Sequence, residues 1–287
     1  MRMITQPNNI RIKDNKGSEM KTDGTRFQFG KNWERYIQML DEKRIETAER
    51  SLQEMLEMQD LKGKRFLDAG SGSGVFSLAA RNLGATVTSF DYDPESVACT
   101  EQLKQRYYSG DENWCVRQGD VLDQEFLDSL GTYDIVYSWG VLHHTGEMWR
   151  ALDNIVRLIR VNGVLFTAIY NDQGWLSRYW GGVKRIYNSG SLGRLVMIIL
   201  HAPYLYLLRR LIRMVIRRGQ PSRGMALWID TMDWLGGYPF EVAKPEQIFE
   251  YLKKSGFLLR QLKTCGGRHG CNEFVFRREA SRQVSQN

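Results

Sequence analysis

The spacing of hydrophobic positions changes along the chain and divides it into segments. Residues 31–58 carry apolar side chains at helical spacing, which predicts an amphipathic helix. From residue 65 onward, short apolar runs alternate with stretches of helical periodicity. These predict strands at 65–69, 86–90, 114–117, 134–138 and 163–169, and helices at about 74–83, 94–107 and 147–159. Strands that alternate with helices form βαβ units, so we expect a parallel sheet with both faces covered.

The alternation stops at residues 171–240 and resumes with a helix over 245–255, which has proline in its first turn. Two further strands, 257–264 and 273–278, are joined by a short glycine-rich connection, which predicts a hairpin. The hydrophobic pattern therefore predicts one α/β core that is interrupted by a long insert.

The first predicted strand leads into a glycine loop, 66-FLDAGSGSGVF-76. Glycines at the end of a strand let the backbone approach a ligand closely. Val75 stands where a dinucleotide-binding loop has its third glycine, and the Lys-Ser/Thr ending of a P-loop is missing. Asp68 would repel a pyrophosphate. Its charge favours a cationic ligand such as S-adenosylmethionine (SAM), which carries an ammonium and a sulfonium but no phosphate.

Four motifs follow one another in the order that a known family has them. The first is Asp68–Gly74, and Asp91 ends the next strand, 19 residues after Gly72. The third is Gly119-Asp120-Val121, and the fourth is 133-YDIVYSWGVLHHT-145. The chain resembles the class I SAM-dependent methyltransferases, in the small-molecule branch typified by quinone-biosynthesis enzymes. The stretch 157-RLIRVNGVLFTAIYN-171 resembles their turn into strand five, with Val-Asn-Gly in place of Pro-Gly-Gly.

This resemblance implies a Rossmann-like, seven-stranded, mostly parallel sheet with helices on both faces and one antiparallel strand near an edge. It covers about residues 62–171 and 240–278. The expected organisation is a flexible arm (1–24), a helical cover (25–61), a SAM-binding core (62–171), a helical lid or acceptor insert (172–240), the completion of the core sheet (241–279) and a flexible tail (280–287).

The resemblance also implies which residues contact SAM, whose demethylated product is S-adenosylhomocysteine. Asp91 would accept the ribose hydroxyls, and Asp120 would lie near the adenine amino group. For Asp120 a cap of its own turn stays open as an alternative, and for Trp139 a place in the core stays open. The expected cofactor-binding residues are Asp68, Gly70, Ser71, Gly72, Gly74, Asp91, Tyr92, Asp120, Val121 and Trp139.

Catalysis of methyl transfer needs alignment and, for a hydroxyl or ammonium acceptor, a base. His143 and His144 follow strand four and Tyr170 follows strand five, at the edge where open α/β sheets bind ligands. We expect these three as catalytic candidates, with structural histidines as the alternative. The expected acceptor-binding residues are Trp33, Asn171, Trp175, Trp234 and Tyr238, each of which could equally serve packing or a turn.

The net charge of +7 is concentrated in the insert. Residues 173–229 contain ten Lys or Arg and no Asp or Glu, so the rest of the chain sums to 7 − 10 = −3. Residues 192–218 read as a basic amphipathic helix, in which we expect Pro203 to cause a break or kink. A lid over the acceptor, contact with an anionic membrane, binding to RNA phosphates and a homodimer interface all stay open.

The remaining features narrow the class of protein. The N-terminus lacks the apolar stretch of a signal peptide, and four scattered cysteines suggest neither a disulfide framework nor a metal site. We expect a cytoplasmic enzyme, peripheral at the inner membrane surface if the insert binds lipid. It would methylate oxygen, in preference to nitrogen or carbon, of a small or lipid-like acceptor. A regulatory or membrane-surface SAM-binding protein without catalysis is the alternative, and an RNA methyltransferase is favoured less.

Overall fold

The computed structural model describes residues 33, 37–216, 232, 234–267 and 270–280, with the backbone alone at 206 and 208–216. The predicted arm at 1–24, the tail from 281 and most of the predicted cover before residue 37 lie outside these ranges. So do the side chains of Arg209 and Arg213 and all of Arg217, which carry the basic character of the expected amphipathic helix.

A seven-stranded sheet forms the centre of the protein, in the order β3-β2-β1-β4-β5-β7-β6. The first five strands are parallel, and β7 runs antiparallel to both of its neighbours. This confirms the predicted Rossmann-like sheet. The strands are β1 (Arg65–Ala69), β2 (Thr86–Asp91), β3 (Trp114–Gln118), β4 (Tyr133–Trp139), β5 (Ile159–Tyr170), β6 (Phe257–Lys263) and β7 (Cys271–Arg278).

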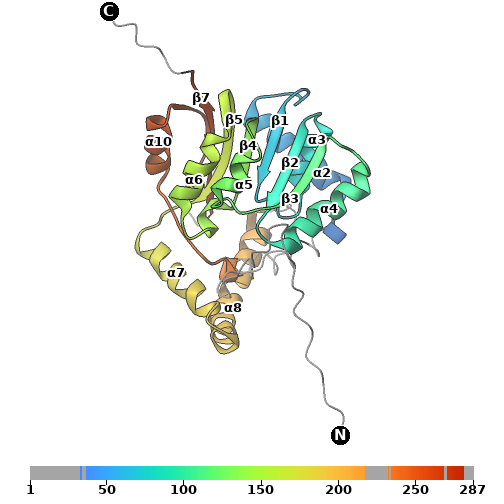
Figure 1. The fold of residues 1–287 in the computed structure, drawn as a ribbon. Helices are drawn as coiled ribbons and strands as arrows, with labels where there is room; N and C mark the ends of the chain where they lie inside the picture. Colours follow the sequence, from blue (N-terminus) through green and yellow to red (C-terminus); the bar gives the residue numbers. More distant parts are fainter. Residues whose placement is uncertain (1–32, 34–36, 217–231, 233, 268–269, 281–287) are drawn as a thin grey trace, which may run out of the picture.

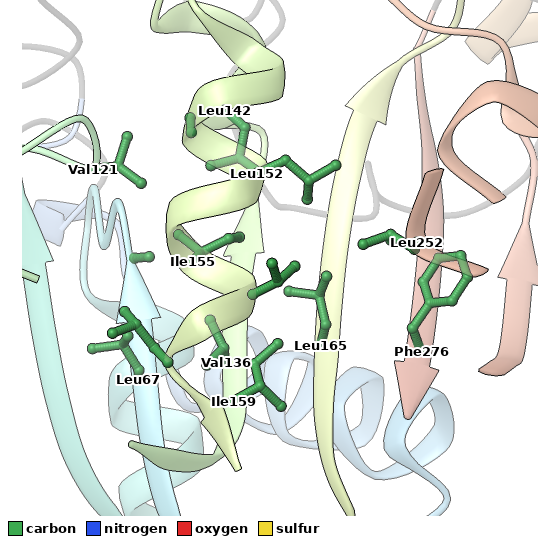
Figure 2. Packing of buried hydrophobic residues seen from close by; sticks show 14 of the residues in the cluster. Leu67, Val121, Val136, Leu142, Leu152, Ile155, Ile159, Leu165, Leu252 and Phe276 are labelled. Carbon is green, nitrogen blue, oxygen red and sulfur yellow. The ribbon is translucent and has the colours of Figure 1, made fainter. Parts of the chain in front are cut away.

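Helices cover both faces of the sheet (Figure 1). One face packs against α2 (Glu42–Leu56), α3 (Val75–Asn82) and α4 (Pro94–Tyr108). The other packs against α5 (Gln124–Asp128), α6 (Met148–Arg157) and α10 (Pro245–Lys254). On this second face, Leu152 and Ile155 of α6 lie over Val136 and Leu165 of the central strands (Figure 2). Two buried layers therefore hold the sheet edge rigid where its loops emerge.

The insert after β5 consists largely of α7 (Trp175–Tyr187) and α8 (Ser191–Ile216), which lie below the sheet in Figure 1. These two helices pack through a third apolar cluster, which includes Trp180, Val183, Met197, Leu205 and Trp234. Among the described residues, no helix is long and apolar enough to cross a bilayer. The insert therefore has its own small core beside the sheet.

Three local predictions are wrong or incomplete. The helix predicted over 31–58 is interrupted before Glu42, where the carboxylate of Asp41 caps α2 by accepting the N–H of Arg44 at 2.9 Å. Of the break or kink expected at Pro203, the break does not occur: α8 continues through this residue, although a proline cannot donate the helical hydrogen bond to residue 199. The short α5 and the 3₁₀ turn η1 (Leu142–His144) have no periodicity that a sequence pattern could reveal.

Candidate active site

The glycine loop connects β1 to α3 at the carboxyl edge of the sheet. The N–H groups of Gly70 and Ser71 donate to the carbonyl oxygen of Phe90 at 2.8 and 3.0 Å, which fastens the loop to the end of β2. Gly70, Gly72 and Gly74 all have positive φ, at 86°, 54° and 78°. The order of strands reverses between β1 and β4, so the loop stands at the topological switch point where open α/β sheets bind ligands.

Close neighbours also require glycine in this loop. A Cβ on Gly70 would lie 2.4 Å from a methyl of Val141, and one on Gly74 would lie 2.9 Å from the Cα of Thr100. At Gly72 the neighbour is the indole of Trp33, at 3.1 Å. The structure thus places the predicted acceptor residue Trp33 against the glycine loop.

Asp91 ties the end of β2 to the tip of this loop. Its Oδ2 accepts the N–H of Gly72 at 2.9 Å, and its Oδ1 accepts the N–H of Asp93 at 2.9 Å. Two backbone donors therefore set the plane of the carboxylate. Gly119 after β3 donates its N–H to the backbone carbonyl of Asp91 at 3.0 Å, so the third motif meets the second here.

Asp68 points beneath the loop, into a buried polar network. Its Oδ2 accepts the hydroxyl of Ser77 at 2.5 Å, and Ser77 Oγ lies 2.7 Å from Ser89 Oγ, which accepts the indole N–H of Trp114. Burial raises the pKa of Asp68 to about 7; the Ser77 hydrogen bond lowers it, and the nearby charge of Asp91 raises it further. The carboxylate thus supports α3 and the loop from below.

The other predicted cofactor residues lie along the same edge. Asp120 Oδ1 accepts the N–H of Leu122 at 2.9 Å, so Asp120 caps its own turn. Val121 is buried, and its carbonyl accepts the side-chain amide of Asn154 at 2.9 Å. Tyr92 follows β2, and the half-buried Trp139 ends β4 and packs against the core of the first face.

The two histidines of η1 have opposite hydrogen-bonding roles. His144 Nδ1 lies 2.7 Å from the carbonyl oxygen of Pro239, which can only accept, so this nitrogen carries the proton and Nε2 has the lone pair. His143 Nδ1 instead accepts the N–H of Tyr170 at 3.3 Å. His143 is only 1% exposed, whereas His144 is 9% exposed. Of the two, His144 has the arrangement of a base.

A row of aromatic rings, which we name the aromatic wall, lies between the histidines and the insert and consists of Tyr170, Trp234 and Phe240. The ring of Tyr170 lies 3.9 Å from that of His143 and 5.4 Å from that of His144, between centroids. Trp234 and Phe240 follow at 5.5 and 5.3 Å from Tyr170. The structure therefore brings the predicted residues Tyr170 and Trp234 together with the histidine pair.

Three residues of this region escaped sequence reasoning. The buried Lys184 of α7 donates to the carbonyl of Trp234, and its ammonium lies 4.4 and 4.8 Å from the rings of Trp234 and Phe240. Glu241 accepts the N–H of Met148 at 3.0 Å and so caps α6. Phe240 and Glu241 lie two and three residues after the predicted acceptor residue Tyr238, which was the available signal. Lys184 had no signal that distinguished it from the other cations of the basic insert.

The remaining predicted acceptor residues take other positions. The side chain of Trp175 is 70% exposed at the start of α7. Asn171 Oδ1 accepts the amide of Asn272 at 3.0 Å, and Asn171 bridges to Ala243, so this residue joins β5 to neighbouring segments. Tyr238 is half-buried just before Pro239. The contacts described here thus place Asn171 beside Asn272 and Ala243, and they leave Trp175 facing solvent.

Comparison with known proteins agrees with this geometry. Residues 67–167, from β1 to β5, match the family model described as a methyltransferase domain. This part of the chain is therefore similar to methyltransferase domains, which supports the resemblance to the class I SAM-dependent methyltransferases that its motifs indicate. The match ends before the insert, so it covers the glycine loop and the histidine pair but neither α7 nor α8.

Curated relatives of the methyltransferase domain act on different acceptors. The chain is 29% identical over 114 residues to a ubiquinone biosynthesis O-methyltransferase of Glaesserella parasuis, covering 39% of this chain and 47% of the relative. It is 33% identical over 112 residues to a ribosomal protein L11 methyltransferase of Prochlorococcus marinus, covering 38% and 36%. The chain thus spans less than half the length of these relatives, and the matched part does not determine the acceptor.

A solved structure extends the similarity of fold beyond the matched domain. The magnesium protoporphyrin IX methyltransferase from Synechocystis PCC 6803, crystallised with S-adenosylhomocysteine, has a TM-score of 0.52. The alignment covers 87% of this chain and 94% of that one at 17% identity, which shows a common fold.

Proposed function

We propose that the protein transfers the methyl group of SAM to an oxygen of a small, largely apolar acceptor, with His144 as the base. The observation that carries this proposal is the placement of His144 on the turn after β4. Its Nδ1 is occupied by the carbonyl of Pro239, and its ring stands at the aromatic wall on the edge that also bears the glycine loop.

The charges around the loop suit SAM as the cofactor. Asp68 and Asp91 lie close enough that the charge of Asp91 raises the pKa of Asp68, and residues 66–80 contain no Lys or Arg. A loop with the carboxylate of Asp91 at its tip and no basic side chain of its own disfavours phosphates and suits a ligand with a ribose and a cationic methionine portion. Asp91 would accept the ribose hydroxyls, because its plane is already set by two backbone donors.

The chain's own residues supply alignment and proton transfer. SAM provides the methyl group and an excellent leaving group. The Nε2 of His144 would take the proton of an acceptor hydroxyl, because Nδ1 already holds a proton against Pro239. The ring of His143, which packs against Tyr170, also contacts the imidazole of His144 and limits its rotation. Tyr170, Trp234 and Phe240 favour an acceptor with a flat apolar portion.

Calorimetric titration with SAM and with S-adenosylhomocysteine tests the cofactor. We expect binding at micromolar concentration, weakened about a hundredfold by Asp91→Asn, because hydrogen bonds to a charged group contribute about 1.5–3 kcal/mol each. Asp111→Asn is the matched control, because Asp111, like Asp91, accepts a backbone N–H two residues further along the chain. It lies beyond the opposite end of α4, where Arg81 is its other donor. Absence of binding, or equal affinity of Asp91→Asn and wild type, would exclude SAM as the cofactor.

Transfer of radiolabelled methyl from SAM into lipid and small-molecule extracts tests the acceptor and the base. Resistance of the product to mild alkali and acid separates an aryl ether from an ester. With an acceptor in hand, His144→Gln should lower kcat by a factor of about 10²–10⁴ without weakening SAM binding. His143→Gln is the adjacent control and should lower kcat less, because its Nδ1 is already engaged by Tyr170. Equal loss in both variants would contradict the assignment of His144.

A further inference from the structure

One face of α8 carries a continuous apolar surface that no other part of the described chain covers. Six large apolar side chains on it are 55% to 73% exposed. At about 100° per residue they occupy roughly half of the helix circumference. We name this set the α8 stripe: Leu192, Leu195, Ile199, Leu200, Tyr204 and Leu207.

The opposite face of the same helix is already used for packing. Met197, Ala202 and Leu205 are 7%, 2% and 6% exposed and belong to the cluster shared with α7 and Trp234. The helix is therefore apolar on both sides, whereas a surface helix of a soluble domain normally has a polar outer face. Exposed apolar side chains that gather in one patch, unlike scattered ones, mark an interaction site.

The insert that contains the α8 stripe is strongly basic, which favours an anionic partner. Residues 173–229 include ten Lys or Arg and no acidic residue. Within the described part, Arg178, Arg185 and Arg194 have exposed side chains. A protein partner of ordinary composition would not require the complete absence of acids, whereas the headgroups of an anionic bilayer repel every carboxylate near the surface.

We propose that α8 docks the protein onto an anionic membrane surface, with the α8 stripe inserted at the boundary of headgroups and acyl chains and the positive charge of residues 173–229 attracting the protein to the headgroups. A helix with one apolar outer face lies in the membrane plane. This agrees with the absence, among the described residues, of any helix able to span a bilayer. The inference goes beyond the proposed methyl transfer, and its test needs neither SAM nor an acceptor.

Flotation with vesicles of phosphatidylcholine, with and without phosphatidylglycerol, tests the proposal on the full chain. Wild type should float with the anionic vesicles and much less with the neutral ones, and added salt should weaken binding. Leu195→Ser with Ile199→Ser should lower vesicle affinity roughly a hundredfold, since each buried aliphatic side chain contributes a factor of about ten or more.

Leu258→Ser with Leu262→Ser is the matched control. These two leucines of β6 are 46% and 44% exposed and lie on the edge strand of the sheet. Their replacement should change vesicle affinity less than about twofold. The proposal is overturned if wild type does not bind anionic vesicles or if both double variants bind alike. Light scattering gives a further outcome against it: a wild-type dimer that Leu195→Ser with Ile199→Ser dissociates, together with no vesicle binding. A second copy of the chain would then cover the α8 stripe.

Discussion

The glycine loop and the helical insert use their side chains in different ways. Around the loop, Asp91, Gly72 and Ser77 each make specific hydrogen bonds, and three glycines adopt φ values that other residues avoid. In the insert, packing is provided by rings and aliphatic groups, and the described chain leaves the α8 stripe more than half exposed. The glycine loop therefore needs a particular residue at each of these positions. The insert needs only side chains that are apolar and of suitable size.

This difference explains why one domain type can act on many acceptors. The family match extends over β1 to β5 and stops where the insert begins. A site defined by backbone geometry changes little, while an apolar wall can change its shape by exchange of one ring for another. The following predictions test this contrast, beginning with the largest expected effect.

Replacement of Gly70 by alanine should be the most damaging change. Its φ of 86° costs an L-residue about 1–2 kcal/mol, and the overlap of the new Cβ with Val141, at 2.4 Å, costs about 1–3 kcal/mol more. Urea unfolding should show a total loss of about 3 kcal/mol, and calorimetry should show loss of SAM binding.

Gly63→Ala is the control for the backbone contribution alone, because Gly63 has a φ of 70° and no neighbouring atom lies within 4 Å of the position that a Cβ would take there. Its loss should be about 1–2 kcal/mol. Gly70→Ala should lose more unfolding free energy than Gly63→Ala, and adding Val141→Ala to Gly70→Ala should recover part of this extra loss. If Gly70→Ala costs no more than Gly63→Ala, the close approach of Val141 does not constrain the loop.

Asp68 should make the stability of the loop region depend on pH. Its pKa in the folded protein is raised to about 7, above its ordinary value of 3.8, so the folded state favours the neutral carboxyl. This contribution is fully present below about pH 4 and is lost as pH rises through about 7. Compared with Asp68→Asn, wild type should lose on the order of 2 kcal/mol of unfolding free energy between pH 5 and pH 8.

Urea unfolding of both proteins at the two pH values measures this difference. Calorimetry near pH 6.5 in buffers of different ionisation enthalpy adds a test of the ligand's charge. A cationic ligand close to Asp68 should release a fraction of a proton on binding, because it favours the charged carboxylate. Parallel pH profiles for wild type and Asp68→Asn would show that Asp68 is ionised in the folded protein throughout.

Most of the sheet and the loop could be predicted from sequence because local signals and tertiary structure agree there. The strand predicted at 65–69 has the bounds of β1, since a buried strand followed by glycines has few alternatives. The direction of the Asp68 side chain could not be predicted, because it depends on Ser77 and Ser89, two serines from different elements. The tautomer of His144 depends in the same way on Pro239, 95 residues away.

The insert was harder to predict for a physical reason. Pro203 was expected to break or kink the helix, but α8 continues through it, and the cluster with α7 and Trp234 stabilises α8 on both sides of the proline. The ring contact of Tyr170 with His143 and the burial of Lys184 likewise depend on contacts between distant segments. Sequence periodicity identifies an apolar helix, but it does not reveal which of its two faces is buried.

Glu241 connects the segment after the insert to the histidine turn η1 and to α6, and its removal should have an intermediate effect. Its carboxylate accepts the N–H of Met148, and its own N–H donates to the carbonyl of His143 at 2.9 Å. Glu241→Ala should lower the unfolding free energy by about 1 kcal/mol, the usual contribution of a helix cap. Glu241→Gln should lose less, because its amide oxygen can still accept, and urea unfolding of the two variants makes the comparison. If Glu241→Gln loses as much unfolding free energy as Glu241→Ala, the negative charge matters more than the hydrogen bond.

The smallest effect on stability should come from the α8 stripe. Leu195→Ser with Ile199→Ser should change the unfolding free energy by less than about 0.5 kcal/mol per site, because both side chains are more than half exposed. Met197→Ser on the same helix should cost about 2–3 kcal/mol, because Met197 is 7% exposed within the cluster of the insert. Urea unfolding without lipid measures both. If the double variant loses as much unfolding free energy as Met197→Ser, protein covers the α8 stripe in solution. Both faces of α8 would then pack against protein, as the core helices do.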